Sequence, residues 1–369
     1  MNDPATLDNG ALLWLDDVGL EHLPQVGAKL ARLGALRSRG SRVPDGFVLS
    51  VAAFDAFLPA IGRAELERIL NRAMPNPEAG AAIAQEARDL IQRQAFPDWM
   101  EERLGRAYSE LCERCGLGPA LSTAVRSSGV SEDGDGASFA GQYDTYLGIR
   151  SAQSVLEHIR KCWASQYTAR AVDYRRRRGM ALGVQGIAVG VLQLVNARSA
   201  GVAFTINPLN GDRRRVVVES NWGFGESVVA GLTTPDHWLL DKATGEVLEE
   251  RIGAKQVWSV FDEVQGRVVE CEATADRATL PSLSPEEVRH VARLAVEIES
   301  REGRPQDVEW AVSADISFPD GLFLLQHRPE TVWGGRPAPE PEPEPDMSEP
   351  YDPAQYALRK VFKIPVRRA

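Results

Sequence analysis

The chain has 369 residues, of which 43% are hydrophobic and 25% charged, and its formal net charge is −10. This composition is typical of a globular protein with two or three subdomains, and the acidic balance argues against a nucleic-acid or anionic-membrane partner. The longest apolar runs fall short of the roughly 20 residues that cross a bilayer. The acidic N-terminus and only four cysteines favour the reducing cytoplasm.

The N-terminal half begins with a compact unit and continues into a helical stretch. Residues 11–60 predict a glycine loop, an amphipathic helix, a turn, a short strand and a second helix. Residues 61–118 have apolar residues at helical spacing throughout. Within that stretch Cys112 and Cys115 form a C-x-x-C with no second ligand pair. We therefore interpret them as structural thiols on a helix.

Short β-rich runs begin near residue 119, and two further helices follow. The strand-like runs are STAVRSS, YDTYLGI, IAVGVLQLV, AGVAFTI, RRVVVESN and HWLLD. Residues 151–178 predict one helix that ends in four arginines. Residues 285–302 predict another, because Pro285 and two glutamates suit the positive end of a helix dipole. The strands DVEWAV and GLFLLQHR come last, and the composition changes after Trp333.

The stretch from Ala124 to Gly148 contains the strongest local signal. A short apolar run ends in Arg126 and two serines, and an acidic, glycine-rich loop follows. Small residues allow backbone N–H groups to approach phosphate oxygens, and an arginine supplies a fixed positive charge with fork geometry. Lys29 adds a second cation, because it follows a glycine at the start of a predicted helix, where a phosphate can bind.

The two last strands carry four polar residues at alternating positions. Asp307 and Glu309 share one strand face, and Gln326 and Arg328 share another. Antiparallel pairing through the turn at Pro319-Asp320-Gly321 would bring the four together, and oxygen ligands beside a cation suit Mg²⁺ and nucleotide phosphates. The alternative is a solvated salt-bridge ladder. A further glycine-interrupted loop, residues 220–231, either contacts a ligand or only turns the chain, and Glu219 and Glu226 accompany it.

The order of these motifs resembles a known family. VGAKLARLG, VPDGFVLSVAAF, AVRSS…EDGDGASFAGQYDTYL, SAGVAFTINP, ESNWGFGESVVAG and DVEWAV…LLQHRPET are similar to the nucleotide-binding domain of phosphoenolpyruvate synthase and pyruvate phosphate dikinase, which rifampicin phosphotransferase shares. The resemblance covers residues 11–333. It implies an α+β, ATP-grasp fold with a helical N-terminal segment, in which two subdomains close on ATP and Mg²⁺.

The resemblance also implies a division of the chain. It places an N-terminal subdomain at residues 1–195, with a helical insert at 61–118 and a phosphate loop at 126–145. A C-terminal subdomain with the metal-binding strands occupies residues 196–333. By composition, residues 334–349 form a Pro-Glu linker. Residues 350–369 form a basic tail that either docks to a partner or has no function.

Roles for single residues follow from matching positions. Lys29, Arg126 and Thr145 would contact phosphates, and Gly141 would lie in the loop over them. Gln193 would lie near the base or its hinge. Glu309 and Gln326 would hold Mg²⁺ with Asp307 in support, and Arg328 would face the transferring phosphate. One departure is Ala28, where the family usually has a second glycine, which matters little if φ is negative there.

The resemblance implies a phosphoryl transfer that the five histidines of the chain do not complete. None of them lies in a glycine- and threonine-rich loop of the kind that carries a phosphoryl group. We therefore expect the accepting histidine on the swivelling domain of a separate subunit, as in a split, phenylphosphate synthase-like member. That partner would pass the group to a small molecule such as a phenol or pyruvate. The alternatives are a non-catalytic ATP-binding module and a self-contained ATP-grasp carboxylate ligase.

Overall fold

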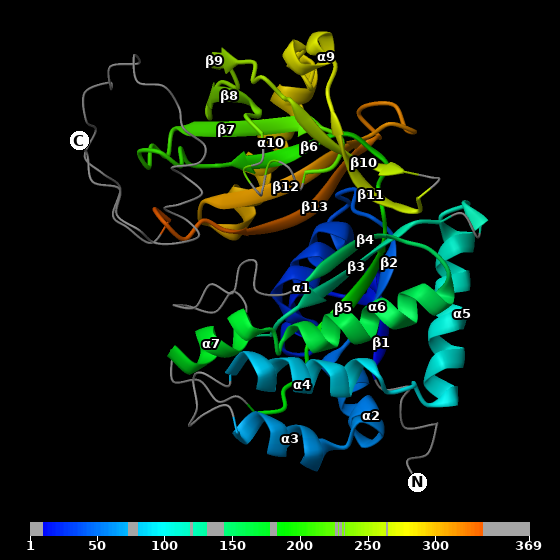
Figure 1. The fold of residues 1–369 in the computed structure, drawn as a ribbon. Coiled ribbons are helices and arrows are strands. Elements are labelled where there is room, and N and C mark those ends of the chain that lie inside the picture. The colour runs from blue at the N-terminus through cyan, green and yellow to red at the C-terminus, as the bar shows by residue number, and fades with distance from the viewer. Residues whose placement is uncertain are drawn as a thin grey trace. The chain divides into compact units, whose positions relative to one another are not determined.

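The computed structural model describes residues 10–72, 80–118, 121–130, 144–177, 183–225, 228, 231, 233–262 and 265–334. The chain divides into two compact units, one formed by Met1–Leu194 with Glu263–Arg267 and the other by Val195–Asp262 with Val268–Ala369. Each unit contains its own antiparallel sheet with helices packed on it (Figure 1). This arrangement confirms the predicted α+β class.

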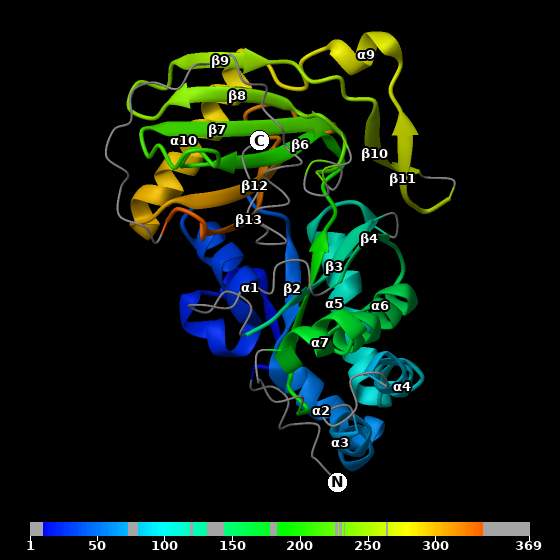
Figure 2. The same ribbon diagram turned by 60° about the vertical axis from the view of Figure 1, so that its left-hand side comes forward.

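The first unit contains a five-stranded sheet in the order β1-β2-β5-β3-β4. Its strands are β1 (Leu12–Trp14), β2 (Gly46–Leu49), β3 (Thr123–Ser128), β4 (Thr145–Ile149) and β5 (Ala188–Gln193). Its helices are α1 (Leu23–Ser38), α2 (Val51–Ile61), α3 (Arg63–Asn71), α4 (Gly80–Gln92), α5 (Asp98–Arg114), α6 (Ala152–Ser165) and α7 (Ala169–Arg177), and short 3-10 turns occupy Leu15–Asp17 and Leu20–His22. Figure 2 shows α1 and α6 on opposite sides of the sheet.

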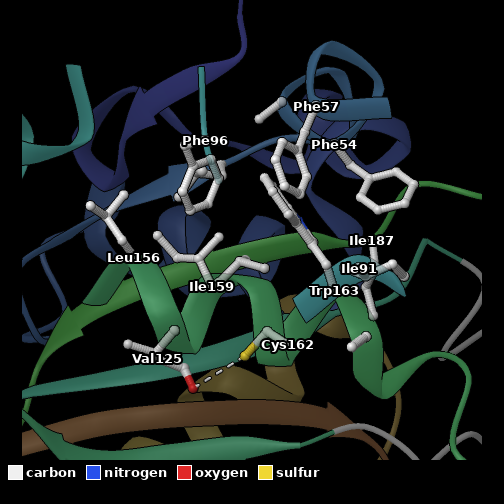
Figure 3. Close-up of a cluster of buried hydrophobic side chains, with 14 of the residues drawn as sticks. Phe54, Phe57, Ile91, Phe96, Val125, Leu156, Ile159, Cys162, Trp163 and Ile187 are labelled. Carbon is white, nitrogen blue, oxygen red and sulfur yellow. Dashed lines mark hydrogen bonds between the residues drawn. The ribbon is translucent and has the colours of Figure 1, made fainter. Parts of the chain in front are cut away.

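Aromatic side chains from two helices and one loop form the centre of the first unit's core (Figure 3). The indole of Trp163 on α6 stacks edge-on against Phe54 at 5.5 Å between ring centroids, and Phe57 and Phe96 lie 5.3 and 5.7 Å from it. Trp163, Phe54 and Phe57 are fully buried. Aromatic rings bury large areas and prefer such tilted contacts, so this cluster fixes α2 and α6 against the sheet.

The predicted single helix over residues 151–178 is wrong, because the structure has two helices there. Helix α6 ends at Ser165 and α7 begins at Ala169. The hydroxyl of Thr168 accepts a hydrogen bond from the Ala171 amide at 3.1 Å, which caps the new helix. A capping threonine satisfies an amide that a continuous helix would have bonded to its own backbone. It therefore favours the start of a new helix at this point.

The second unit contains a six-stranded antiparallel sheet in the order β13-β12-β6-β7-β8-β9, and a separate two-stranded β10-β11 hairpin. The strands are β6 (Ala197–Phe204), β7 (Arg215–Trp222), β8 (Asp236–Asp241), β9 (Val247–Arg251), β10 (Val257–Asp262), β11 (Arg267–Glu272), β12 (Gln306–Ser313) and β13 (Leu322–Pro329). The helices are α9 (Ala275–Thr279) and α10 (Pro285–Glu302), and α10 covers one face of the sheet (Figures 1 and 2).

Helix α10 has the bounds that the sequence predicted. Its start is fixed by a capping box, in which Ser284 accepts from the Glu287 amide and Glu287 accepts from the Ser284 amide. Its end is the left-handed Gly303. These local signals occur at both ends, which explains why the sequence located this helix well.

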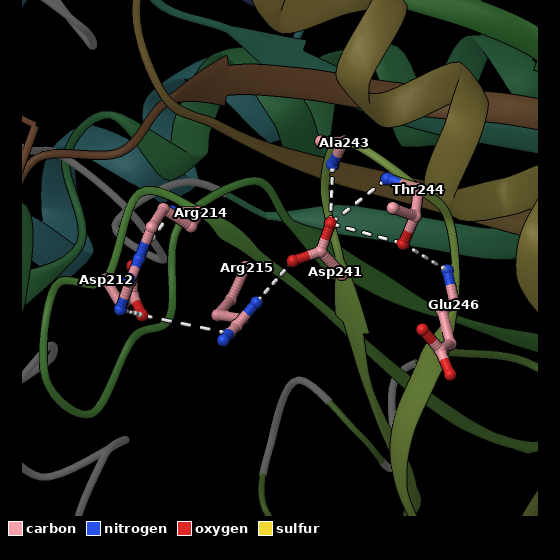
Figure 4. Close-up of polar contacts among 7 residues, drawn as sticks. All are labelled: Asp212, Arg214, Arg215, Asp241, Ala243, Thr244 and Glu246. Atoms are coloured by element: carbon pink, nitrogen blue, oxygen red, sulfur yellow. Dashed lines mark hydrogen bonds and ion pairs between the residues drawn. The ribbon is translucent and has the colours of Figure 1, made fainter. Parts of the chain in front are cut away.

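Two polar clusters hold the loops of the second unit. The β8–β9 turn is closed by Asp241, which accepts hydrogen bonds from the Ala243 and Thr244 amides and pairs with Arg215 (Figure 4). At the other end of β8, the fully buried Lys255 and Asp236 form an ion pair. Asp236 also accepts from the Ser282 amide at 2.7 Å. A buried charge pair is tolerated only with such additional hydrogen bonds, so this cluster fixes the segment that leads into the hairpin.

None of the helices in the described residues is long and apolar enough to span a lipid bilayer.

Candidate functional site

The four polar residues of the last two strands are brought together as the sequence predicted. Strands β12 and β13 pair antiparallel with Asp307 opposite Arg328 and Glu309 opposite Gln326. The Arg328 guanidinium donates from Nε to Asp307 Oδ2 at 3.2 Å, and the Gln326 amide donates to Glu309 Oε1 at 3.2 Å. The pairing prediction is confirmed, and it places a cation, two carboxylates and an amide on one patch of sheet.

Burial decides between the two interpretations of this patch. Asp307 is 3% exposed and Gln326 6% exposed, whereas a solvated salt-bridge ladder would leave both open to water. Val308 and Trp310 lie on the opposite face of β12, on the side that α10 covers, and both are buried. The alternative of a solvated ladder is therefore wrong for these residues, since a buried polar cluster calls for hydrogen-bonding or ionic partners.

The polar patch continues into an apolar strip on the same face of the sheet. Val202, Phe204 and Val217 form a buried cluster there, with Leu239 packed against it. Phe204 pairs with Asp307 and Val217 pairs with Phe204, so the strip begins directly beside the carboxylates. One sheet face thus carries charged groups on β12 and β13 and buried apolar side chains on β6 and β7.

In the first unit, the start of helix α1 lies against the end of β3. Gly27 has φ +73°, and a Cβ there would lie 2.6 Å from the Ser128 carbonyl oxygen. The Ser128 hydroxyl accepts from the Leu30 amide at 3.5 Å, at the limit of a hydrogen bond. Lys29 therefore occupies the first turn after a bend at Gly27, which agrees with the predicted glycine-then-helix start. Ala28 has no positive φ, so its departure from the family pattern causes no strain.

Arg126 and Thr145 are direct neighbours in the same sheet. They are register partners in β3 and β4, and Arg126 pairs on its other side with Gly190 of β5. A Cβ on Gly190 would lie 2.6 Å from a methyl group of Leu30 and 3.6 Å from the Arg126 side chain. Arg126 and helix α1 therefore share one face of the sheet, and the missing side chain at Gly190 leaves room for both.

The ends of the glycine-rich loop meet at Ser127 and Asp144. The Ser127 hydroxyl donates to the Asp144 carbonyl oxygen at 2.9 Å, and the Tyr146 hydroxyl donates to the Asp144 carboxylate at 3.0 Å. Burial and the nearby Asp144 carboxylate raise the pKa of the Cys162 thiol well above its usual range, and Lys29 opposes them.

Two predicted site residues do not join these groups. Gly141 lies outside the described residues. Gln193 is the last residue of β5, where its backbone N–H donates to the Asp45 backbone carbonyl oxygen at 2.7 Å. It lies three positions from Gly190, and side chains alternate along a strand, so it falls on the opposite face from Arg126. Its role near a base or hinge stays a prediction.

Sequence reasoning missed the contacts made by Gly27, Ser128 and Asp144. The residues themselves were visible in the motifs VGAK, AVRSS and QYDTY, but no spacing rule connects positions a hundred residues apart. The thiols of Cys112 and Cys115 are both free, and burial raises the pKa of Cys115 to about 11. A protonated thiol is a poor ligand and nucleophile, so the structural interpretation of the C-x-x-C is supported.

Each unit, taken by itself, carries groups that suit part of a phosphorylated ligand with a divalent cation. In the second unit, Arg328 and Glu309 lie on neighbouring strands. In the first unit, Arg126 shares a sheet face with helix α1, which carries Lys29. The described residues hold no cluster of three or more histidine, cysteine or acidic side chains that could hold a metal alone. Two carboxylates fit Mg²⁺ better, because this ion takes one or two carboxylates and completes its shell with water and phosphate.

These features define the chain as an ATP-grasp-type nucleotide-binding protein. Residues 23–349 match the family model described as pyruvate phosphate dikinase, AMP/ATP-binding domain. The chain belongs to this family, and its ATP-grasp fold class follows from that membership.

Similar curated proteins are phosphoenolpyruvate synthases by name. A probable phosphoenolpyruvate synthase of Staphylothermus marinus is 38% identical over 347 residues, which cover 88% of this chain and 42% of that protein. The phosphoenolpyruvate synthase of Aeropyrum pernix is 36% identical, covering 89% of this chain and 43% of that protein. The enzyme of Pyrococcus furiosus is 31% identical, covering 86% and 43%. The chain thus spans less than half the length of these relatives.

Proposed function

We propose that the chain binds ATP with Mg²⁺ and transfers the β-phosphoryl group to a histidine on a partner subunit. In balanced form, ATP, water and the partner imidazole yield AMP, orthophosphate and phosphohistidine. The partner then phosphorylates a small acceptor, such as a phenol or pyruvate. The observation that supports this best is the buried pairing of Asp307 with Arg328 and of Glu309 with Gln326, in a chain of the ATP-binding dikinase family.

Each of these side chains has a distinct task in the proposal. Asp307 fixes the Arg328 guanidinium through its 3.2 Å hydrogen bond, so the arginine is oriented before charge develops on the transferring group. Fixed donors of this kind stabilise a transition state without reorganising, and phosphoryl transfer depends mostly on such positioning. Lys29, Arg126 and Thr145 bind the phosphates from the first unit, with Gly141 in the loop over them.

Glu309 and Gln326 are the proposed Mg²⁺ ligands, with Asp307 in support. Gln326 donates its amide N–H to Glu309, so the side-chain atom with which it would bind a cation is its carbonyl oxygen. When bound, the ion would neutralise charge on the phosphate oxygens. The donor set fits Mg²⁺, because all of the contributed atoms are oxygens and only two of the residues are charged.

The five histidines support an acceptor outside the present sequence. His22 ends a 3-10 turn, and His158 and His290 lie within helices α6 and α10. His237 and His327 are buried in strands, at 7% and 2% exposure. A phosphoryl carrier must reach its donor and then its acceptor, and none of these positions offers that freedom.

Product analysis in the presence of the partner tests the proposal. The chain is mixed with [β-³²P]ATP and with proteins that co-purify with it, and labelled protein, AMP and ADP are measured. We expect acid-labile label on a partner, together with AMP. ATP binding without AMP in the presence of the partner would favour a non-catalytic module. ADP release by the chain alone would favour a self-contained carboxylate ligase.

The last part of the sequence is the proposed docking element for the partner. Residues 334–349 are a Pro-Glu spacer, and residues 350–369 combine basic and apolar side chains, which suits a short tethered binding segment. Removal of residues 335–369 should weaken co-purification of the partner and leave ATP affinity unchanged. Unchanged co-purification would show that this segment does not dock.

A further inference from the structure

A second carboxylate lies in the same row of the sheet as Glu309. Glu309 of β12 pairs with Val202 of β6, Val202 pairs with Glu219 of β7, and Glu219 pairs with His237 of β8. Directly paired residues of antiparallel strands point to the same face. Glu219 and Glu309 therefore share the face opposite α10, two strands and about 10 Å apart.

Glu219 is a buried carboxylate with one of its two oxygens left unsatisfied. It is 5% exposed, and its Oε1 atom has no hydrogen-bond partner in the part of the chain that the structure describes. The His237 Nδ1 atom lies 3.6 Å away, which is beyond hydrogen-bond distance. A buried carboxylate oxygen without a donor is costly, so a position that keeps one calls for a donor from outside the chain.

The surface between the two carboxylates indicates which donor fits. Val202 separates Glu309 from Glu219, and Phe204 and Val217 extend the apolar strip alongside. An apolar strip next to phosphate- and metal-binding groups suits the uncharged nucleoside part of a nucleotide. A second metal ion is less suited to Glu219, because the described residues hold no cluster of three acidic, histidine or cysteine ligands there.

We propose that Glu219 accepts hydrogen bonds from the ribose hydroxyls of the bound nucleotide. This inference rests on the proposed function, since it assumes that the nucleotide lies on this sheet face with its phosphates toward Glu309. A carboxylate offers two acceptor oxygens and no donor, which matches the two donating hydroxyls of a ribose. Glu219 thereby makes the site select ribonucleotides.

Deoxynucleotides isolate the contact, because they remove the hydroxyls without touching the protein. Affinities of the full chain for ATP, 2′-deoxy-ATP and 3′-deoxy-ATP are measured by calorimetry at fixed Mg²⁺. The wild type should prefer ATP by about tenfold or more, as expected for a hydrogen bond to a charged group. Glu219→Gln should bind ATP about tenfold more weakly and lose much of the preference. Glu219→Met, which keeps the length but has no acceptor oxygen, should bind all three nucleotides alike.

Two control variants separate this role from a general effect. Glu309→Gln should weaken ATP and both deoxynucleotides by the same factor, because it acts through the phosphates and the metal. Glu250→Gln, on an exposed position of the edge strand β9, should change none of the affinities. Thermal melts of every variant show whether the fold is retained.

Several results would overturn the assignment of Glu219. A wild type that binds the three nucleotides equally, or a Glu219→Gln variant that loses affinity for all of them by one factor, would exclude the ribose contact. A raised Mg²⁺ requirement in Glu219→Gln with unchanged nucleotide preference would assign the residue to the metal instead. In each of these cases the wild type still binds ATP. Failure of the wild type to bind ATP at all would instead contradict the proposed function itself.

Discussion

The two units of this chain build their candidate binding groups in different ways. In the second unit, the side chains themselves are paired, with Asp307 against Arg328 and Glu309 against Gln326 on adjacent strands. In the first unit, the decisive contact is made by backbone, where Gly27 lies against the carbonyl of Ser128. The second unit is therefore organised for charge stabilisation. The first unit depends on the close approach of Gly27 in α1 to Ser128, the last residue of β3 before the glycine-rich loop.

This difference teaches where each kind of substitution should act. Exchanging a paired side chain in the second unit removes a charge or a ligand while the sheet register stays. Adding a single carbon in the first unit displaces backbone that carries Lys29 and Arg126. Substitutions of paired side chains and substitutions at close backbone contacts therefore test the two units separately.

The largest effect is expected from Arg328→Ala. The variant removes the fixed cation that we propose faces the transferring group, and the loss of one such arginine lowers phosphoryl transfer by about 10³-fold or more. The measurement is AMP release and partner labelling under saturating ATP. Arg328→Lys should recover only part of the rate, because it keeps the charge and loses the fork.

A matched control for Arg328→Ala is Arg289→Ala, on an exposed position of α10, which should keep the wild-type rate. Circular dichroism and thermal melts establish that both variants fold. Labelling of the partner by Arg328→Ala at the wild-type rate would refute its placement at the transferring phosphate.

The next effect concerns stability and is confined to the second unit. Lys255 and Asp236 are both fully buried and paired, so Lys255→Met leaves a buried carboxylate without its countercharge. Breaking a buried pair by removing one partner costs about 3–5 kcal/mol. Hydrogen exchange should show lost protection in β7, β8 and the segment around Ser282, and unchanged protection in the first unit's sheet.

A second substitution sharpens this test. Lys255→Met combined with Asp236→Asn removes both charges and should recover part of the lost stability, because the uncompensated charge is gone. If the double variant is as unstable as the sum of the single ones, the pair is not the source of the stabilisation. Equal loss of protection in both units would show that they do not unfold separately.

How much the sequence could predict follows from the same contrast. The period of two along DVEWAV and LLQHR fixes which side chains share a face, and the turn at Pro319-Asp320-Gly321 brings the strands together, so the pairing of these four residues was predicted correctly. Helix α10 was located because its end signals are local. The fold class also followed from the resemblance, since six motifs occur in the family's order.

What the sequence could not predict depends on contacts between distant segments. The break between α6 and α7 arises because Thr168 caps a new helix within an otherwise continuous helical pattern. The approach of Gly27 to Ser128 joins positions a hundred residues apart. The burial of Glu219 depends on which sheet face is covered, and alternation alone does not show that. The roles of Lys29, Thr145 and Gln193 stay predictions.

A smaller effect distinguishes the close approach of Gly27 to Ser128 from the strain of a positive φ alone. Gly27 is a non-helical bend inside α1 and Gly40 follows its C-terminal end, and both have positive φ, at +73° and +83°. A Cβ at Gly40 meets nothing within 4 Å, whereas one at Gly27 meets the Ser128 backbone. Gly40→Ala should therefore cost about 1–2 kcal/mol of stability only. Gly27→Ala should cost more, and should also weaken ATP binding.

The measurement for this pair is ATP affinity by calorimetry together with thermal melting. Since a Cβ at Gly27 would meet the Ser128 backbone as well as its hydroxyl, Ser128→Ala should not restore ATP binding to Gly27→Ala. An ATP affinity reduced equally by Gly27→Ala and Gly40→Ala would show that the close approach to Ser128 has no special part in binding.

The smallest effect is expected from Asp241→Asn in the β8–β9 turn (Figure 4). Backbone hydrogen bonds from Thr244 and Ala243, opposed by a small burial effect, lower the pKa of Asp241 below its ordinary value of 3.8, and Arg215 acts in the same direction. A lowered pKa means that the folded protein holds the proton less tightly than the unfolded chain. The contribution to stability is therefore complete above the ordinary pKa and is lost as the pH falls through the lowered one.

Asparagine keeps the acceptor oxygen for the two turn amides and removes the charge and the second acceptor oxygen, which pairs with Arg215. Asp241→Asn should thus melt slightly below the wild type at pH 7. The difference should shrink as the pH falls from 3.8 through the lowered pKa, below which the wild-type carboxyl is uncharged as well. The comparison is Asp16→Asn in the first unit. There burial raises the pKa of the carboxyl, but Arg37 and Arg114 outweigh it and lower the pKa overall. A difference in melting temperature between Asp241→Asn and the wild type that stays constant from pH 7 to pH 3 would show that the turn depends on its hydrogen bonds and not on its charge.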